Sequence, residues 1–172
     1  MRRLSLFGLT LLSLFYLMAA GPLAQEELLR PADGPRVLLA AVGDIYLGGG
    51  LGERIRREGP DYPWRGTIEV LKKADLRIGN LESVLSRTGR VYVPKQYTLR
   101  ADPEAVAALV SGGFNVVSLA NNHAMDYGWP PLEETIGLLD REGIAHCGAG
   151  INLAAARAPA FLSVNGLRLA FL

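Results

Sequence analysis

Four short apolar runs alternate with helical segments, and this alternation restricts the fold more than any other feature of the sequence. The runs cover residues 37–42, 76–79, 116–119 and 144–147. The first of them is continuously apolar, which is typical of a strand that is covered on both faces. Strands that alternate with helices predict an α/β fold whose sheet is largely parallel.

The segments between and after these runs carry their own signals. Asp102 before Pro103 predicts an N-cap and the start of a helix, and glycines at 112–113 predict its end. Residues 83–96 are expected to be a polar excursion without regular structure. An Asn-Gly turn at 165–166 predicts a hairpin that forms an antiparallel edge of the sheet. Helices are expected at residues 52–58, 67–74, 103–112 and 131–142.

The amino terminus differs in character from the rest of the chain. Arg2 and Arg3 precede an uncharged apolar run at residues 4–20. This pattern is typical of a secretory signal or of an uncleaved signal anchor. The sequence therefore predicts a signal peptide or anchor at residues 1–24, a linker at 25–35 and a domain at 36–172 that lies outside the cytoplasmic membrane, secreted or membrane-anchored.

The composition excludes some functions and one kind of stabilisation. The formal net charge is +1 and there is no long run of Lys or Arg, which argues against a nucleic-acid partner. Cys147 is the single cysteine, so an intramolecular disulfide is impossible and the fold must be held by its core. We expect Cys147 to be a small buried apolar residue.

Polar side chains follow three of the four predicted strands. Carboxyl ends of parallel strands meet at one edge of the sheet, where α/β proteins bind their ligands. Carboxylates and amides beside a histidine suit a hard divalent metal such as Mn²⁺ or Mg²⁺. Each residue alone has a plainer alternative, because Asp caps turns, Asn tolerates left-handed backbone and a lone His is often structural. The residues are Asp44, Asn80, Glu82, Asn121, Asn122 and His123.

Three strings in the sequence resemble motifs of one family. GDIYLG at 43–48, GNLE at 79–82 and NNHAMDYG at 121–128 are similar to successive motifs of CapA-type capsule (poly-γ-glutamate) synthesis proteins. The resemblance runs from about residue 37 to the end of the chain. It implies a calcineurin-like metallophosphatase fold, an α/β/β/α sandwich, of which this chain would encode an incomplete, N-terminal half.

The resemblance also implies roles for particular residues. Asp44, Asn80, Glu82 and Asn122 would be metal ligands, and His123 would be the acid or electrostatic partner of the substrate.

Other residues near these motifs leave the chemistry open. Asp126 either orients His123 or caps the following turn. Tyr46 stands where the related phosphoesterases carry His, and Asn80 stands where they carry Asp. We therefore expect an incomplete dinuclear centre in this chain.

Three functions are compatible with these motifs. The first is capsule or poly-γ-glutamate synthesis outside the cytoplasmic membrane, with an anionic polymer or capsule precursor as partner and a membrane-bound synthesis complex as the setting. The second is an extracytoplasmic metal-dependent phosphoester hydrolase. The third is a non-catalytic polymer-binding module. Metal-dependent turnover of a generic phosphoester separates the second from the others.

Overall fold

The computed structural model describes residues 34–92 and 94–172. The predicted signal segment at 1–24, and most of the predicted linker at 25–35, lie outside the described residues. Residues Pro35–Leu172 form one compact unit. Within the described part of the chain, no helix combines the length and the apolar character that crossing a bilayer requires.

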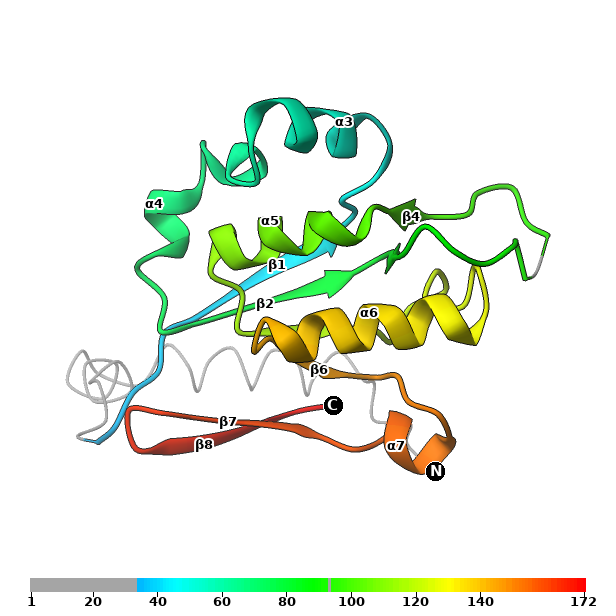
Figure 1. Cartoon of the computed structure of the whole chain (residues 1–172). Helices are drawn as coiled ribbons and strands as arrows, with labels where there is room; N and C mark the ends of the chain where they lie inside the picture. The colour runs from blue at the N-terminus through cyan, green and yellow to red at the C-terminus, as the bar shows by residue number, and fades with distance from the viewer. Residues whose placement is uncertain (1–33, 93) are drawn as a thin grey trace, which may run out of the picture. The chain divides into compact units, whose positions relative to one another are not determined.

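A four-stranded parallel sheet is the centre of this unit, with strand order β1-β2-β5-β6 (Figure 1). The predicted α/β class with a parallel sheet is confirmed, whereas the four-layer sandwich stays a prediction. The strands of the sheet are β1 (Leu39–Ile45), β2 (Leu76–Leu81), β5 (Val116–Ser118) and β6 (Ala145–Cys147).

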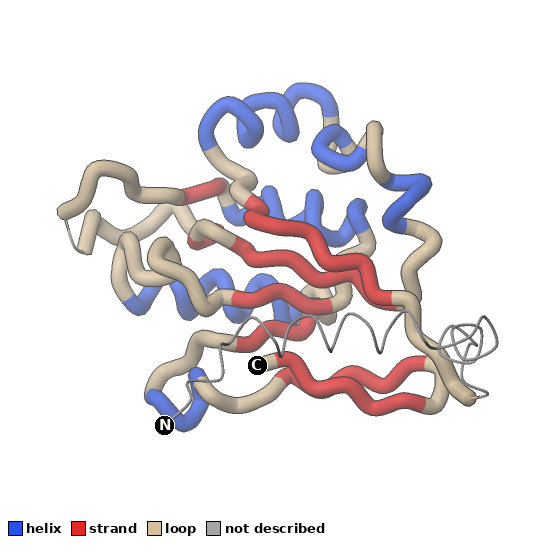
Figure 2. Tube along the Cα trace, turned by 180° about the vertical axis from the view of Figure 1, so that it is seen from behind, coloured by secondary structure: helices blue, strands red, loops and turns tan. Residues whose placement is uncertain are grey.

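The helices that connect these strands lie on one face of this sheet, as Figure 2 shows with the strands in front and the helices behind them. Each strand is added beside the one before it, and right-handed crossovers then place every connecting helix on the same side. The helices are α3 (Gly49–Glu58), α4 (Ile68–Leu71), α5 (Val106–Gly112), α6 (Trp129–Arg141) and α7 (Leu153–Ala156), with 3₁₀ turns η1 (Tyr62–Trp64) and η2 (Pro103–Ala105).

The core fills the space between the helices and the sheet. Leu81 and Val117 from the sheet and Leu109 and Leu139 from the helices are fully buried. Gly79 has no room for a side chain, since a Cβ there would lie 2.4 Å from Cδ1 of Ile45. Such close packing fixes where the strands end, and therefore where the polar residues that follow them lie.

One predicted strand boundary and one predicted cap need correction. The predicted run at 37–42 corresponds to β1, which begins at Leu39 and continues through Asp44 to Ile45, with a register shift between Ala41 and Asp44. Asp102 does precede a helical segment, but its side chain makes no capping hydrogen bond. Its carboxylate instead accepts hydrogen bonds from two arginines, which are stronger donors than a backbone N–H.

The predicted polar excursion was wrong at its start. Residues 83–86 are buried, and β3 (Val84–Leu85) pairs in parallel with β4 (Arg100–Ala101). The Leu85 N–H donates to the buried hydroxyl of Thr135 on α6 at 2.8 Å. Two-residue strands carry too little periodicity to be recognised in the sequence.

The predicted hairpin is present, but its predicted place in the fold was wrong. β7 (Ala160–Val164) and β8 (Leu167–Phe171) pair antiparallel around Asn165 and Gly166, which both have positive φ. They form a separate two-stranded sheet and share no ladder with the parallel sheet. The Asn165 side chain instead donates to the carbonyl of Arg36, ahead of β1.

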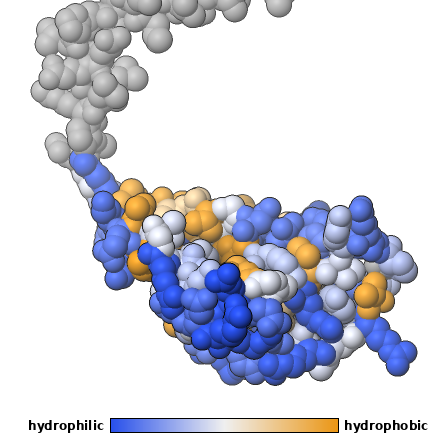
Figure 3. All heavy atoms as spheres, turned by 90° about the horizontal axis from the view of Figure 1, so that it is seen from above, coloured by the Kyte–Doolittle hydropathy of each residue, from blue (hydrophilic) through white to orange (hydrophobic). Residues whose placement is uncertain are grey.

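Apolar residues are also exposed at the start of the described chain. Leu38 and Leu39 are exposed, and Figure 3 shows hydrophobic residues gathered next to this point. Cys147, by contrast, is buried as predicted, and burial raises the pKa of its thiol.

Candidate functional site

The carboxyl ends of β1, β2 and β5 bring the predicted polar residues together. Asp44 is paired with Asn80 in the sheet, and Asn80 is paired with Ser118 at the end of β5. Asn121 follows three residues later. The site therefore lies where strand order and direction predicted it, and a strand irregularity just before Asp44 is common beside functional sites.

A chain of side-chain hydrogen bonds runs across these strand ends. Asn80 donates from Nδ2 to Oδ1 of Asp44 at 2.8 Å. Asn121 donates from Nδ2 to Oδ1 of Asn80 and to the carbonyl of Leu81, both at 2.9 Å. The Asn121 Oδ1 accepts the N–H of His123 at 3.0 Å. Asn121 thus joins the end of β2 to the turn that carries His123.

His123 is held on its other side by a buried aspartate. Nδ1 of His123 lies 2.8 Å from Oδ2 of Asp126, and the two side chains are 12% and 1% exposed. The Leu99 N–H donates to the same Asp126 oxygen at 2.6 Å. Lys95 forms an ion pair with Oδ1 of Asp126 and donates to the carbonyl of Asn122 at 2.6 Å. We call Asp44, Asn80, Asn121, His123, Asp126 and Lys95 the strand-end network.

The charge of Asp126 determines what His123 can do. Burial acts to raise the pKa of Asp126, but hydrogen bonds from Lys95, His123 and the Leu99 N–H outweigh burial and hold that pKa below its usual range. An ionised carboxylate only accepts hydrogen bonds, so Nδ1 of His123 carries the proton. Nε2 is then the imidazole nitrogen left for a ligand or a substrate. Of the two open roles for Asp126, the structure supports orientation of His123.

The remaining predicted ligands differ in their surroundings. Asp44 lies near the end of β1 and Asn122 follows β5, with β2 between these two strands. Glu82 follows β2, and its N–H donates to the carbonyl of Ile45 at 3.0 Å. No hydrogen bond or ion pair involves the side chains of Glu82 and Asn122 within residues 34–92 and 94–172. The amide oxygen of Asn80, by contrast, already accepts a hydrogen bond from Asn121.

The side chains at these strand ends offer mainly oxygen donors. In the described part of the chain, no group of three or more His, Cys, Asp and Glu side chains is placed to hold a metal ion. The oxygens free to bind are the second carboxylate oxygen of Asp44, the carboxylate of Glu82 and the amide oxygen of Asn122. Oxygen donors with few charges are typical of Mg²⁺ and Mn²⁺ sites.

Tyr46 directly follows the last residue of β1. It is half-buried, and burial, followed by the nearby Tyr127, raises the pKa of its hydroxyl. Its ring packs against the turn at Gly48, where a Cβ would lie 2.1 Å from the carbonyl of Arg100. Tyr46 therefore packs this glycine turn onto β4 as a neutral phenol.

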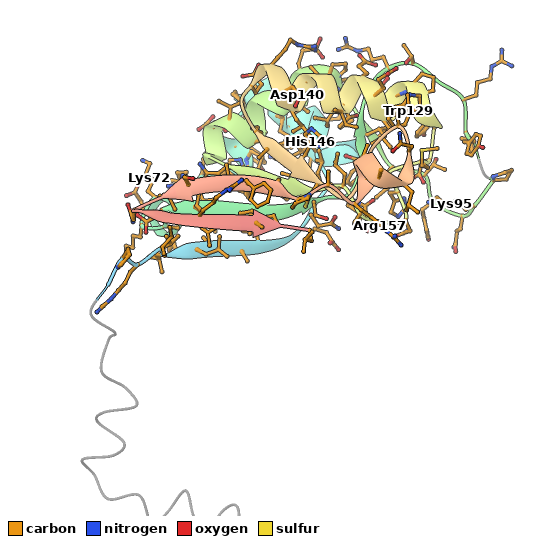
Figure 4. All side chains as sticks on the ribbon, turned by 90° about the horizontal axis from the view of Figure 1, so that it is seen from below. Lys72, Lys95, Trp129, Asp140, His146 and Arg157 are labelled. Atoms are coloured by element: carbon orange, nitrogen blue, oxygen red, sulfur yellow. The ribbon has the colours of Figure 1, made fainter. Side chains whose placement is uncertain are left out.

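The sequence patterns missed the contribution of two residues of the strand-end network. They place Asn121 at the site but favour Asn122 as the ligand, although Asn121 makes the side-chain bonds across the strands. The Asn121-Asn122 pair is the only feature of the sequence that points to a role for Asn121. The pairing of Lys95 with Asp126 could not be predicted from sequence spacing, because Lys95 reaches Asp126 from the long segment after β3. His146 pairs with Asp140 at 3.2 Å, away from the network (Figure 4).

Comparison with known proteins gives a consistent family assignment. The family described as bacterial capsule synthesis protein PGA_cap matches residues 38–172. The capsule biosynthesis protein CapA of Bacillus anthracis is 33% identical over 162 residues, which are 91% of this chain and 39% of that protein. The PGA biosynthesis protein CapA of Bacillus subtilis is 30% identical over 133 residues, 76% of this chain and 35% of that protein. The chain thus spans less than half the length of these relatives.

Proposed function

This chain belongs to the bacterial capsule synthesis protein family PGA_cap, and from that premise we propose that it serves the synthesis of a capsular anionic polymer such as poly-γ-glutamate. The observation that carries this proposal is the match of residues 38–172 to that family, and His123, fixed by the buried carboxylate of Asp126, supplies an ordered imidazole at the strand ends. The named roles of the two Bacillus relatives support the polymer as the class of substrate.

In this proposal, some side chains at the strand ends bind a cation and others position a proton. Asp44, Glu82 and Asn122 hold a divalent cation, Mn²⁺ or Mg²⁺. Asn80 donates a hydrogen bond to Asp44, and its amide oxygen keeps one lone pair with which it can also bind the cation. The cation supplies Lewis acidity and charge neutralisation toward an anionic group. His123 holds or donates a proton at Nε2, and Asp126 keeps the imidazole in the required orientation.

The rest of the proposal concerns fold and location. We take the described unit to be part of a metallophosphatase-like α/β/β/α sandwich, which the parallel sheet and the family both support. The basic, then apolar, first residues support export, with the domain outside the cytoplasmic membrane, secreted or anchored. A membrane-bound synthesis complex is then the natural partner.

A second function, metal-dependent phosphoester hydrolysis, is favoured by the orientation of His123 alone. It predicts that the purified protein with Mn²⁺ releases nitrophenol from bis-(p-nitrophenyl) phosphate, and that His123→Ala abolishes the release. The proposed role in polymer synthesis does not require turnover of this generic substrate. Absence of turnover together with intact metal binding would therefore remove the second function and leave the first.

The proposed function is tested by deletion of the gene and measurement of cell-associated anionic polymer. We expect the polymer to fall strongly and to be restored by the wild-type gene. His146→Ala is the matched control, because His146 is the only other histidine and lies outside the strand-end network. His123→Ala should fail to restore the polymer while His146→Ala succeeds. Unchanged polymer after deletion would contradict the proposal.

A further inference from the structure

A cleft opens next to the strand-end network, between the carboxyl ends of β5 and β6. Its volume is about 790 Å³, within the range of about 300–1,000 Å³ that is usual for small-molecule sites. Asn121 and Asn122 form its polar end. The other walls are largely apolar and include Leu119, Met125, Trp129, Leu132, Ala149 and Ile151.

Backbone packing fixes the floor of this cleft. Gly148 has a positive φ, and a Cβ there would lie 2.5 Å from Cβ of Ala120. The Leu119 N–H donates to the carbonyl of Cys147 at 2.8 Å. The turn after β5 and the turn after β6 therefore meet backbone to backbone, and the cleft keeps its shape without a ligand.

The walls of the cleft favour a flexible aliphatic group. Trp129 packs partly against the core, so only part of its ring is available. The exposed apolar side chains at the mouth are Met125 and Ile151, both of which are aliphatic. Methionine adapts its shape to irregular apolar ligands. Figure 4 places Trp129, Arg157 and Lys95 at the same end of the molecule.

We propose that this cleft binds the alkyl chain of an amphiphile whose phosphate or carboxylate head accepts a hydrogen bond from the side-chain amide of Asn122. Asn122 lines the cleft and immediately precedes His123, so a ligand whose alkyl chain fills the cleft can place its head group beside both residues. The identity of the head group rests on the proposed function, whereas the apolar chain rests on the cleft alone. The ligand class is thus an anionic amphiphile, such as a lipid-linked precursor.

Binding of two phosphate monoesters to the intact protein tests this proposal. Ethyl phosphate and n-octyl phosphate, the latter below its micelle concentration, are compared by isothermal titration calorimetry. We expect n-octyl phosphate to bind on the order of 50-fold more tightly, as burial of about three additional methylenes implies. Equal affinity for the two compounds would overturn the proposal.

A pair of surface variants separates the cleft from nonspecific apolar binding. Ile151→Gln should weaken n-octyl phosphate binding about fivefold, because it removes part of the apolar wall. Leu153→Gln is the matched control, since Leu153 is 65% exposed against 70% for Ile151 but does not line the cleft. We expect Leu153→Gln to bind like the wild type. An equal loss of n-octyl phosphate affinity in both variants, or no loss in Ile151→Gln, would contradict binding in the cleft.

These outcomes are independent of the proposed function. If the gene deletion leaves the polymer unchanged but the preference for the octyl ester persists, the proposed function fails and the cleft stands. If the deletion removes the polymer but the two esters bind equally, the cleft fails and the proposed function stands.

Discussion

Two aspartates in this protein have similar partners but very different surroundings. Asp126 accepts from His123 and the Leu99 N–H and pairs with Lys95, and its side chain is 1% exposed. Asp102 accepts from Arg56 at 2.7 Å and from Arg87 at 3.2 Å, and its side chain is 31% exposed. The first lies in the strand-end network, whereas the second lies on the surface beside α3 and α5.

This difference shows that the hydrogen-bond partners of a charged side chain do not by themselves indicate how much it contributes to stability. Exposed ion pairs are screened by water and contribute about 0–1 kcal/mol. Removing one partner of a buried charge costs about 3–5 kcal/mol, because the remaining charge loses its compensation away from water. Asp126 should therefore control both folding and the position of His123, and Asp102 should control neither.

The largest expected effect is that of Asp126→Ala. This change leaves Nδ1 of the largely buried His123 and the N–H of Leu99 without their acceptor, and it removes the ion-pair partner of Lys95. We expect the free energy of unfolding to fall by about 3 kcal/mol. Urea denaturation measures it, and a loss below about 1 kcal/mol would show that Asp126 behaves like a surface residue.

Asn121→Ala should have the next largest effect. Its side chain makes three hydrogen bonds, which involve Asn80, Leu81 and His123. We expect a loss of about 2 kcal/mol, measured in the same denaturation experiment. Asn152→Ala is the control, because Asn152 only caps the short helix α7 at an exposed position, and it should cost about 1 kcal/mol or less. Equal losses of unfolding free energy in the two variants would show that Asn121 contributes no more than an exposed helix cap.

Acid should weaken the buried aspartate's contribution in a defined direction. The pKa of Asp126 is lower in the folded protein than its usual value, so the carboxylate stabilises the fold above the ordinary Asp pKa of about 3.9. This stability is lost as the pH falls through the lowered pKa. The difference in unfolding free energy between the wild type and Asp126→Asn should therefore shrink as the pH falls below about 4. A difference that does not change down to pH 2 would contradict this.

The smallest effect is expected for Asp102→Ala. Its pKa is also lowered, first by the hydrogen bond from Arg56 and further by Arg87, but solvent screens these pairs. We expect a loss of less than about 1 kcal/mol that largely disappears in 1 M NaCl. A loss of unfolding free energy as large as that of Asp126→Ala would show that exposure does not separate the two aspartates.

The sequence predicted the parallel sheet and the place of the site because both depend on local patterns. Apolar runs that end in Asp44, Asn80 and Asn121 indicate strands, and strand direction then brings their ends together. The Asn-Gly turn predicted the hairpin for the same reason, since Asn165 and Gly166 accept positive φ.

What the sequence could not predict depends on contacts between distant segments. Lys95 reaches Asp126 across 31 residues, which no spacing rule anticipates. The pairing of β3 with β4 rests on two residues in each strand. The neighbouring Pro103 makes Asp102 resemble a helix cap, while its arginine partners come from α3 and from the segment after β3.

Metal binding at the strand ends tests the central claim most directly. The intact protein is titrated with Mn²⁺ by calorimetry, with Asp44→Ala as the test variant and Asp102→Ala as the matched removal of an aspartate. We expect saturable binding by the wild type and by Asp102→Ala, and an affinity at least about tenfold lower for Asp44→Ala, since a lost carboxylate ligand removes much of the charge attraction. Equal Mn²⁺ affinity in all three proteins, or no binding by the wild type, would contradict a metal site at this edge of the sheet.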